Sequence, residues 1–73
     1  MDIQTKKAIH HLAWLLSDGR GPQHNFELGA AMYRVEAAEF LSRNGMGKSD
    51  GIWQFTPNNE LRAIMEDSSM EED

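Results

Sequence analysis

The chain has 73 residues, with twelve acidic and seven basic side chains and a formal net charge of −5 at neutral pH. It contains no cysteine, which excludes disulfides, thiolate zinc sites and thiol catalysis. A chain of this length forms one domain at most, and no apolar run approaches the ~20 residues that cross a membrane. We therefore expect one cytoplasmic domain with neither a membrane span nor a signal peptide.

The acidity is concentrated at the C-terminal end. Residues 66–73 hold five acids and no base, so residues 1–65 carry seven acids and seven bases and are neutral. The sequence predicts a single helical domain over residues 1–67 and an acidic, disordered tail over residues 68–73. This tail, with Glu71, Glu72 and Asp73, is either a solvated end or an arm that competes for a basic surface.

The first predicted helix runs from about Ile3 or Thr5 to Leu16. Its apolar side chains share a broad arc of the helical wheel, which is typical of a core-facing helix: Ala8, Ile9, Leu12, Ala13, Leu15 and Leu16. Trp14 lies outside this arc and forms a ladder with Ile3, Lys7 and His10. A large aromatic side chain among polar residues is common at binding anchors, although a later segment of the chain could equally cover it.

The second predicted element is one long central helix from Phe26 to Arg43. Asn25 is a suitable N-cap, and Gly45 follows the helix as a glycine available for a left-handed cap. Apolar residues fall on two opposite arcs of this helix, so we expect both of its faces to be covered. The second arc is formed by Ala38, Ala31, Val35, Leu28 and Met32, and either the last helix or a second copy of the chain would cover it.

A short β segment and a last helix follow. Asp50 and Gly51 have the chemistry of a tight turn, and the run from Ile52 to Phe55 suits a strand. That run pairs with Met46–Lys48 as a hairpin, pairs with another chain, or packs as an extended segment. Thr56 is then expected to cap a helix with Pro57 at its first position. The predicted fold class is mainly α, with a long central helix, one short β-hairpin or extended segment, and a C-terminal helix.

No constellation of residues indicates catalysis. The run from Ser42 to Ser49 is one glycine short of a phosphate-binding P-loop, but a helix precedes it and a strand follows, which is the wrong order. The histidines His10, His11 and His24 do not have the spacing of metal ligands. No nucleophile accompanies a base at an informative spacing. We therefore predict a protein that is not an enzyme and has no catalytic residue, metal or cofactor.

The run FLSRNGMGKSDGIWQFTPNNELRAIM, from Phe40 to Met65, resembles the C-terminal half of a winged-helix domain. In that family a helix ends at a glycine, a hairpin wing turns on Asp-Gly, and a Thr-Pro step opens the next helix. The resemblance implies that the stretch from Arg34 to Arg43 would read the DNA major groove. Glu36 and Glu39 offset the two arginines of this stretch, so the charge pattern favours a protein partner over nucleic acid.

The sequence therefore predicts a small, non-enzymatic, protein-binding module. It is similar in kind to small phage proteins, anti-CRISPR proteins among them, that inhibit a nucleic-acid-handling host enzyme or defence complex. A winged-helix-like DNA-binding regulator and a homodimeric structural module are the alternatives. The candidate contact residues are the helix ladder and the end of the tail: Ile3, Lys7, His10, Trp14, Glu71, Glu72 and Asp73.

Overall fold

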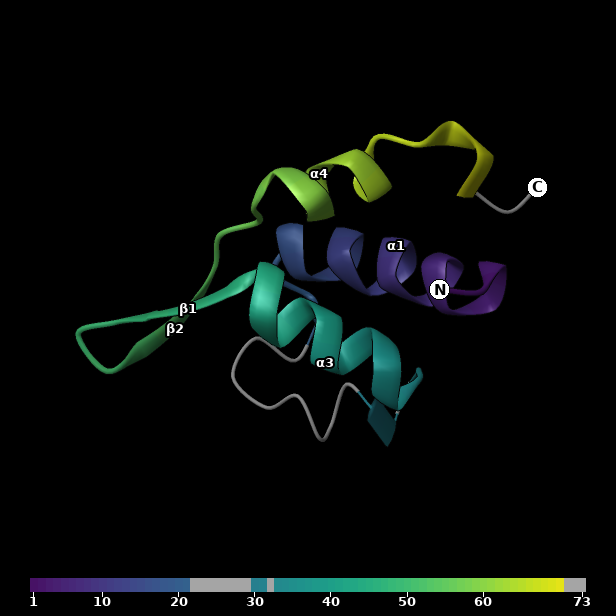
Figure 1. Ribbon diagram of the computed structural model, residues 1–73. Helices are drawn as coiled ribbons and strands as arrows, with labels where there is room; N and C mark the ends of the chain where they lie inside the picture. Colours follow the sequence, from purple (N-terminus) through teal and green to yellow (C-terminus); the bar gives the residue numbers. More distant parts are fainter. Residues whose placement is uncertain (22–29, 32, 71–73) are drawn as a thin grey trace.

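The computed structural model describes residues 1–21, 30–31 and 33–70 of the chain. Figure 1 shows α1 in the middle, with α3 on one side and α4 on the other, and a two-stranded hairpin that projects away from the helices. The prediction of a mainly helical domain is confirmed, and the short β segment, predicted as a hairpin or an extended segment, is a hairpin. None of the helices in the described ranges is long and apolar enough to cross a membrane. The elements are α1 (Ile3–Ser17), α3 (Val35–Asn44), β1 (Met46–Ser49), β2 (Ile52–Phe55), α4 (Asn59–Met65) and the 3₁₀ turn η1 (Ser68–Met70).

Helix α1 is the element against which the other helices pack. Its predicted apolar stripe is confirmed, because the side chains at its centre are fully or almost fully buried: Ile9, Leu12, Ala13 and Leu16. Helices α3 and α4 and the turn η1 all contact α1. Ala37 and Leu41 from α3 and Leu61 from α4 complete the cluster of buried apolar side chains. The core therefore lies on both flanks of α1.

The N-terminus of α1 is capped by a charged side chain. The Asp2 carboxylate accepts a hydrogen bond from the backbone N–H of Thr5 at 2.7 Å. This bond, with smaller contributions from the Thr5 side chain and the Arg34 charge, holds the pKa of Asp2 below its usual range. A carboxyl group whose pKa is lowered by folding adds stability that is present above its unfolded pKa. That stability is lost as the pH falls through the folded pKa.

We expect Asp2→Asn to keep the cap but to remove this pH dependence, because asparagine is also a good N-cap and does not titrate. The unfolding temperature of Asp2→Asn, followed by circular dichroism, should lie below that of the parent at neutral pH. The two temperatures should converge in strong acid, once the Asp2 carboxyl is protonated in the folded parent. Parallel pH profiles for the two proteins would contradict this account.

The prediction of one continuous helix from Phe26 to Arg43 is wrong. Ala30 and Ala31 are helical, but Tyr33 lies in a bend. Arg34 is extended, with φ −137° and ψ 145°, and α3 begins only at the next residue. Residues 22–29 and 32, which include the predicted cap Asn25 and the apolar side chains of Leu28 and Met32, lie outside the described residues.

Tertiary contacts explain this break, which has no proline or glycine at it. The Arg34 guanidinium donates a hydrogen bond to the Thr5 hydroxyl at 3.4 Å and lies 3.8 Å from the Asp2 carboxylate. The Tyr33 ring lies 5.6 Å from the His11 ring, and Tyr33 also packs on the core. Both residues are thus held against α1, and such contacts override helix propensity. Val35, expected on a covered face, is consequently 54% exposed.

Of the three alternatives predicted for the run from Ile52 to Phe55, the structure has the hairpin, with Met46 opposite Phe55 and Ser49 opposite Ile52. Asp50 and Gly51 form its two-residue turn with φ of 52° and 78°. Positive φ at both central residues is the mark of a type I′ turn, which favours Asp-Gly because aspartate tolerates this conformation and glycine has no Cβ. The sequence therefore determines both the turn and the register of the hairpin.

Helix α4 begins two residues later than predicted. Its N-cap is Asn58, whose side-chain oxygen accepts from the Leu61 N–H at 3.0 Å, in place of the predicted Thr56. Asn58 is fixed because its own N–H donates to the Asn44 carbonyl at 2.8 Å and its amide donates to the Asn44 side chain at 2.7 Å. These bonds join the end of α3 to the start of α4. They determine where α4 can begin.

The end of the chain also differs from the prediction. Residues 68–70, predicted as part of the disordered acidic tail, form the turn η1, and Met70 is buried. Asp67 begins this turn by accepting from both the hydroxyl and the backbone N–H of Ser69 at 2.7 and 3.0 Å. The folded body therefore reaches residue 70. Glu71, Glu72 and Asp73 lie outside the described residues.

Candidate functional site

Three of the four predicted ladder residues reach the surface on one side of α1. We call Ile3, Lys7 and Trp14 the outer face of α1, because their spacing places them on the side away from the buried stripe. Ile3 is 50% exposed, Trp14 is 44% exposed and Lys7 is half-buried. His10, the fourth member of the ladder, is buried.

His10 and Trp14 are tied to the C-terminal end of α4. The Trp14 indole N–H donates to the Met65 carbonyl at 3.0 Å, and His10 Nε2 lies 3.0 Å from the same oxygen. Trp14 Nε1 and His10 Nε2 are 3.2 Å apart, and their rings meet edge to face. The last carbonyls of a helix have no partner within the helix, so Met65 is a natural acceptor here. The Trp14 ring is thereby fixed in one orientation while much of it stays exposed.

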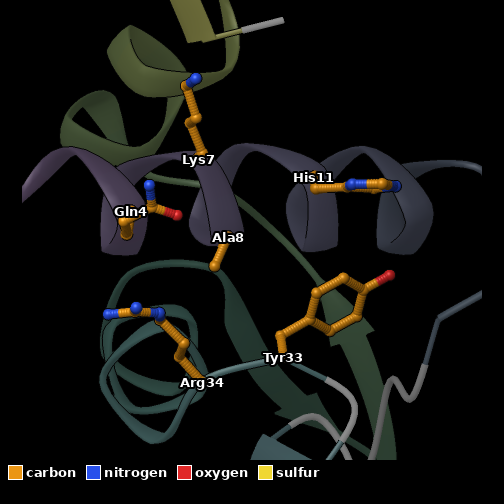
Figure 2. Close-up of a pocket in the computed structure, with 6 residues that line it drawn as sticks. All are labelled: Gln4, Lys7, Ala8, His11, Tyr33 and Arg34. Atoms are coloured by element: carbon orange, nitrogen blue, oxygen red, sulfur yellow. The ribbon is translucent and has the colours of Figure 1, made fainter. Parts of the chain in front are cut away.

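A cleft lies on one flank of the outer face, between α1 and the break before α3. It has a volume of about 240 Å³. Figure 2 shows Tyr33 and Arg34 on one wall, Ala8 and His11 across from them, and Lys7 directed away from Arg34. The residues that line it are Gln4, Lys7, Ala8, His11, Tyr33 and Arg34.

A second cleft lies on the other flank, where α1 meets α4. Its volume is about 280 Å³, and Trp14 forms part of its wall. Its remaining lining residues are Pro57, Arg62, Met65 and Glu66. Lys7 lines the first cleft and Trp14 the second, so the outer face of α1 continues into a hollow on each flank.

The charge of α1 differs from that of the chain as a whole. Between Ile3 and Ser17 the helix carries Lys6 and Lys7 and no acidic side chain. Arg34 lines the first cleft and Arg62 the second. Glu66 also lines the second cleft, and the Asp2 carboxylate lies 3.8 Å from the Arg34 guanidinium. The outer face of α1 is therefore a partly apolar surface with charged side chains of both signs around it.

Sequence reasoning placed the ladder but missed the residues that shape the clefts. Tyr33 and Arg34 enter the first cleft only because the chain breaks there, and no proline or glycine marks that break. Pro57 and Arg62 border Trp14 because α4 packs across α1, which no local pattern reveals. The predicted tail contacts Glu71, Glu72 and Asp73 lie outside the described residues.

The described residues contain no group of three histidine or acidic side chains placed to hold a metal ion. The P-loop-like run from Ser42 to Ser49 contains the end of α3, Gly45 and the whole of β1, so it leads from a helix into a strand. A phosphate-binding loop has the opposite order, in which the helix that follows directs its N-terminus at the phosphates. The run therefore lacks the helix placement of a phosphate-binding loop.

Comparisons with protein-family models, with curated proteins and with solved structures find no match for this chain.

Proposed function

We propose that this protein is a non-enzymatic, protein-binding module whose contact surface is the outer face of α1. The observation that carries the proposal is the state of Trp14, which is 44% exposed although its N–H already has a partner in Met65. An aromatic ring that is fixed before binding loses little conformational entropy when it is buried in a complex. Such rings are common at the energetic centres of protein interfaces.

The surroundings of Trp14 suit the same role. Ile3 adds a second exposed apolar side chain on the same side of α1, and the two flanking clefts can receive side chains of a partner. The rim carries charges of both signs, because Lys7, Arg34 and Arg62 lie there together with Glu66 and, beside Arg34, Asp2. The proposed partner therefore has an apolar centre surrounded by charges of both signs. An inhibitor or an adaptor would use a surface of this kind.

Affinity capture with paired variants tests the proposal. The parent chain, Trp14→Ala and Val35→Ala are immobilised separately and exposed to a lysate of the native host. A protein that binds the parent and Val35→Ala but not Trp14→Ala is the expected result, because Val35 is exposed at the start of α3 and lines neither cleft. Melting curves of the three chains control for unfolding. Equal capture by all three folded chains would contradict the proposal.

A duplex-DNA-binding regulator is the second candidate, and the break at Tyr33 and Arg34 favours it. The order of helical residues, break, α3, hairpin and α4 is closer to a winged-helix domain than one long helix would be. The charged residues of this region do not favour DNA binding. From Arg34 to Phe55 the chain carries three bases and three acids, which gives phosphates no net attraction.

Fluorescence anisotropy with labelled duplex DNA at low salt separates the two candidates. The protein-binding proposal expects no binding at micromolar protein. Submicromolar binding that weakens steeply with salt, and that Arg43→Ala and Lys48→Ala abolish, would replace it with the DNA-binding candidate.

A further inference from the structure

The outer edge of β2 is free for another strand. In a two-residue hairpin the residues that flank the turn, here Ser49 and Ile52, share backbone hydrogen bonds, and such pairs alternate along the ladder. The bond from the Thr56 N–H to the Gly45 carbonyl, at 2.7 Å, continues this alternation. The backbone N–H and C=O groups of Trp53 and Phe55 therefore point away from β1.

The described part of the chain leaves this edge uncovered. The sheet has two strands, and β1 is the one that pairs with β2. Figure 1 shows the hairpin projecting from the helices, which gives a neighbouring strand room to approach. Ile52 is 64% exposed and Trp53 is 38% exposed. A hairpin alone is marginally stable in water, and its open edge is a template for a further strand.

Two copies of β2 can pair as antiparallel strands with Gln54 of one copy opposite Gln54 of the other. In this register Trp53 of one copy faces Phe55 of the other, so the two residues with outward backbone groups meet and form four interchain hydrogen bonds. The facing side chains are an aromatic pair, which is a favourable cross-strand combination. The run Ile52–Phe55 carries no charge, so the two negatively charged copies meet along a neutral strand.

We propose that the partner of the β2 edge is a second copy of this chain, which forms a homodimer with a continuous four-stranded sheet of order β1, β2, β2, β1. The two-fold axis passes beside Gln54, and the two hairpins are related by it. The outer face of α1 is not part of this interface. The dimer would present two copies of that face and would strengthen binding to a repetitive partner.

Cysteine cross-linking tests the register directly, because the natural chain has no cysteine. Gln54 faces its own copy as a non-hydrogen-bonded pair, with Cα atoms about 4.5 Å apart, within the range of about 4.4 to 6.8 Å that a disulfide spans. Gln54→Cys should therefore give a covalent dimer under mild oxidation. Ser49→Cys, exposed on β1 at the far edge of the sheet, is the matched control and should stay monomeric. Equal cross-linking of both variants would overturn the proposal.

Charge substitution provides a second, non-covalent test. Gln54→Lys and Gln54→Glu each place like charges opposite one another across the two-fold axis, while in the monomer the new side chain is exposed to water. Sedimentation equilibrium should show a dimer for the parent, monomers for each variant, and dimers again in their equimolar mixture. A parent chain that is monomeric at tens of micromolar, or that needs an extended peptide of another protein to fill the edge, would overturn the proposal.

Discussion

Replacing Leu61 by alanine should lower the free energy of unfolding by about 3 kcal/mol, which is in the range measured for fully buried leucines. Leu61 is the one residue of α4 that is completely buried, and it lies in the same cluster as Ile9 and Leu41. Its loss would leave a cavity where α1, α3 and α4 meet. A domain of this size has a total stability of roughly 4 to 11 kcal/mol, so the variant should lose a large part of its stability and still fold in the absence of urea.

Urea unfolding followed by circular dichroism measures this effect. Leu61→Met is the matched control, because it conserves most of the volume and should cost less than about 1.5 kcal/mol. Ala63→Ser, at an exposed position two residues further along α4, should change the midpoint little. If Leu61→Ala and Ala63→Ser unfold at the same urea concentration, α4 does not pack on α1 as described.

Replacing Gly45 by alanine should lower the free energy of unfolding by about 2 kcal/mol through overpacking. An added Cβ would lie 2.5 Å from Leu61 Cδ2 and 2.9 Å from Phe55 Cε1, which is closer than such atoms can come. The backbone conformation at this position would accept alanine, because Gly45 has φ −137°, which any residue can adopt. The predicted left-handed cap is therefore not used, and glycine is needed here for space.

A double-mutant cycle with Leu61→Ala isolates this contact. Leu61→Ala removes the closest atom, so Gly45→Ala should cost less in that background, with a coupling of about 1 kcal/mol. Gly51→Ala is not a suitable control, since Gly51 has a positive φ and would be strained by its backbone. Additive effects of the two substitutions in urea unfolding would show that Gly45 and Leu61 do not touch.

Short-range sequence patterns indicated the elements whose stabilising contacts lie within a few residues of one another. The buried stripe of α1 follows from the spacing of Ile9, Leu12 and Leu16, and the hairpin follows from Asp50 and Gly51 between two short β-capable runs. In each case the signal and the structure that it produces are a few residues apart. The hydrogen bonds and contacts that stabilise these elements lie in the same stretch of sequence.

The features that the sequence did not predict depend on contacts between segments that are far apart in the chain. The break at Tyr33 and Arg34 is stabilised by contacts with Asp2, Thr5 and His11, which lie far earlier in the chain, on and just before α1. The sequence predicts Ile3, Lys7, His10 and Trp14 as contact residues, but His10 is buried, with its Nε2 3.0 Å from the Met65 carbonyl at the end of α4. A helical wheel gives the direction of a side chain but not the element that will cover it.

We propose that the outer face of α1, anchored by Trp14, binds the partner of this protein. Isothermal titration of folded chains with the captured partner gives the dissociation constant for the parent, Trp14→Ala and Val35→Ala. We expect Trp14→Ala to weaken binding about 30-fold or more, which corresponds to about 2 kcal/mol, while Val35→Ala, at an exposed position that lines neither cleft, changes it less than about threefold. An unchanged constant for Trp14→Ala, with a large loss for Val35→Ala, would contradict the proposal and place the contact on α3.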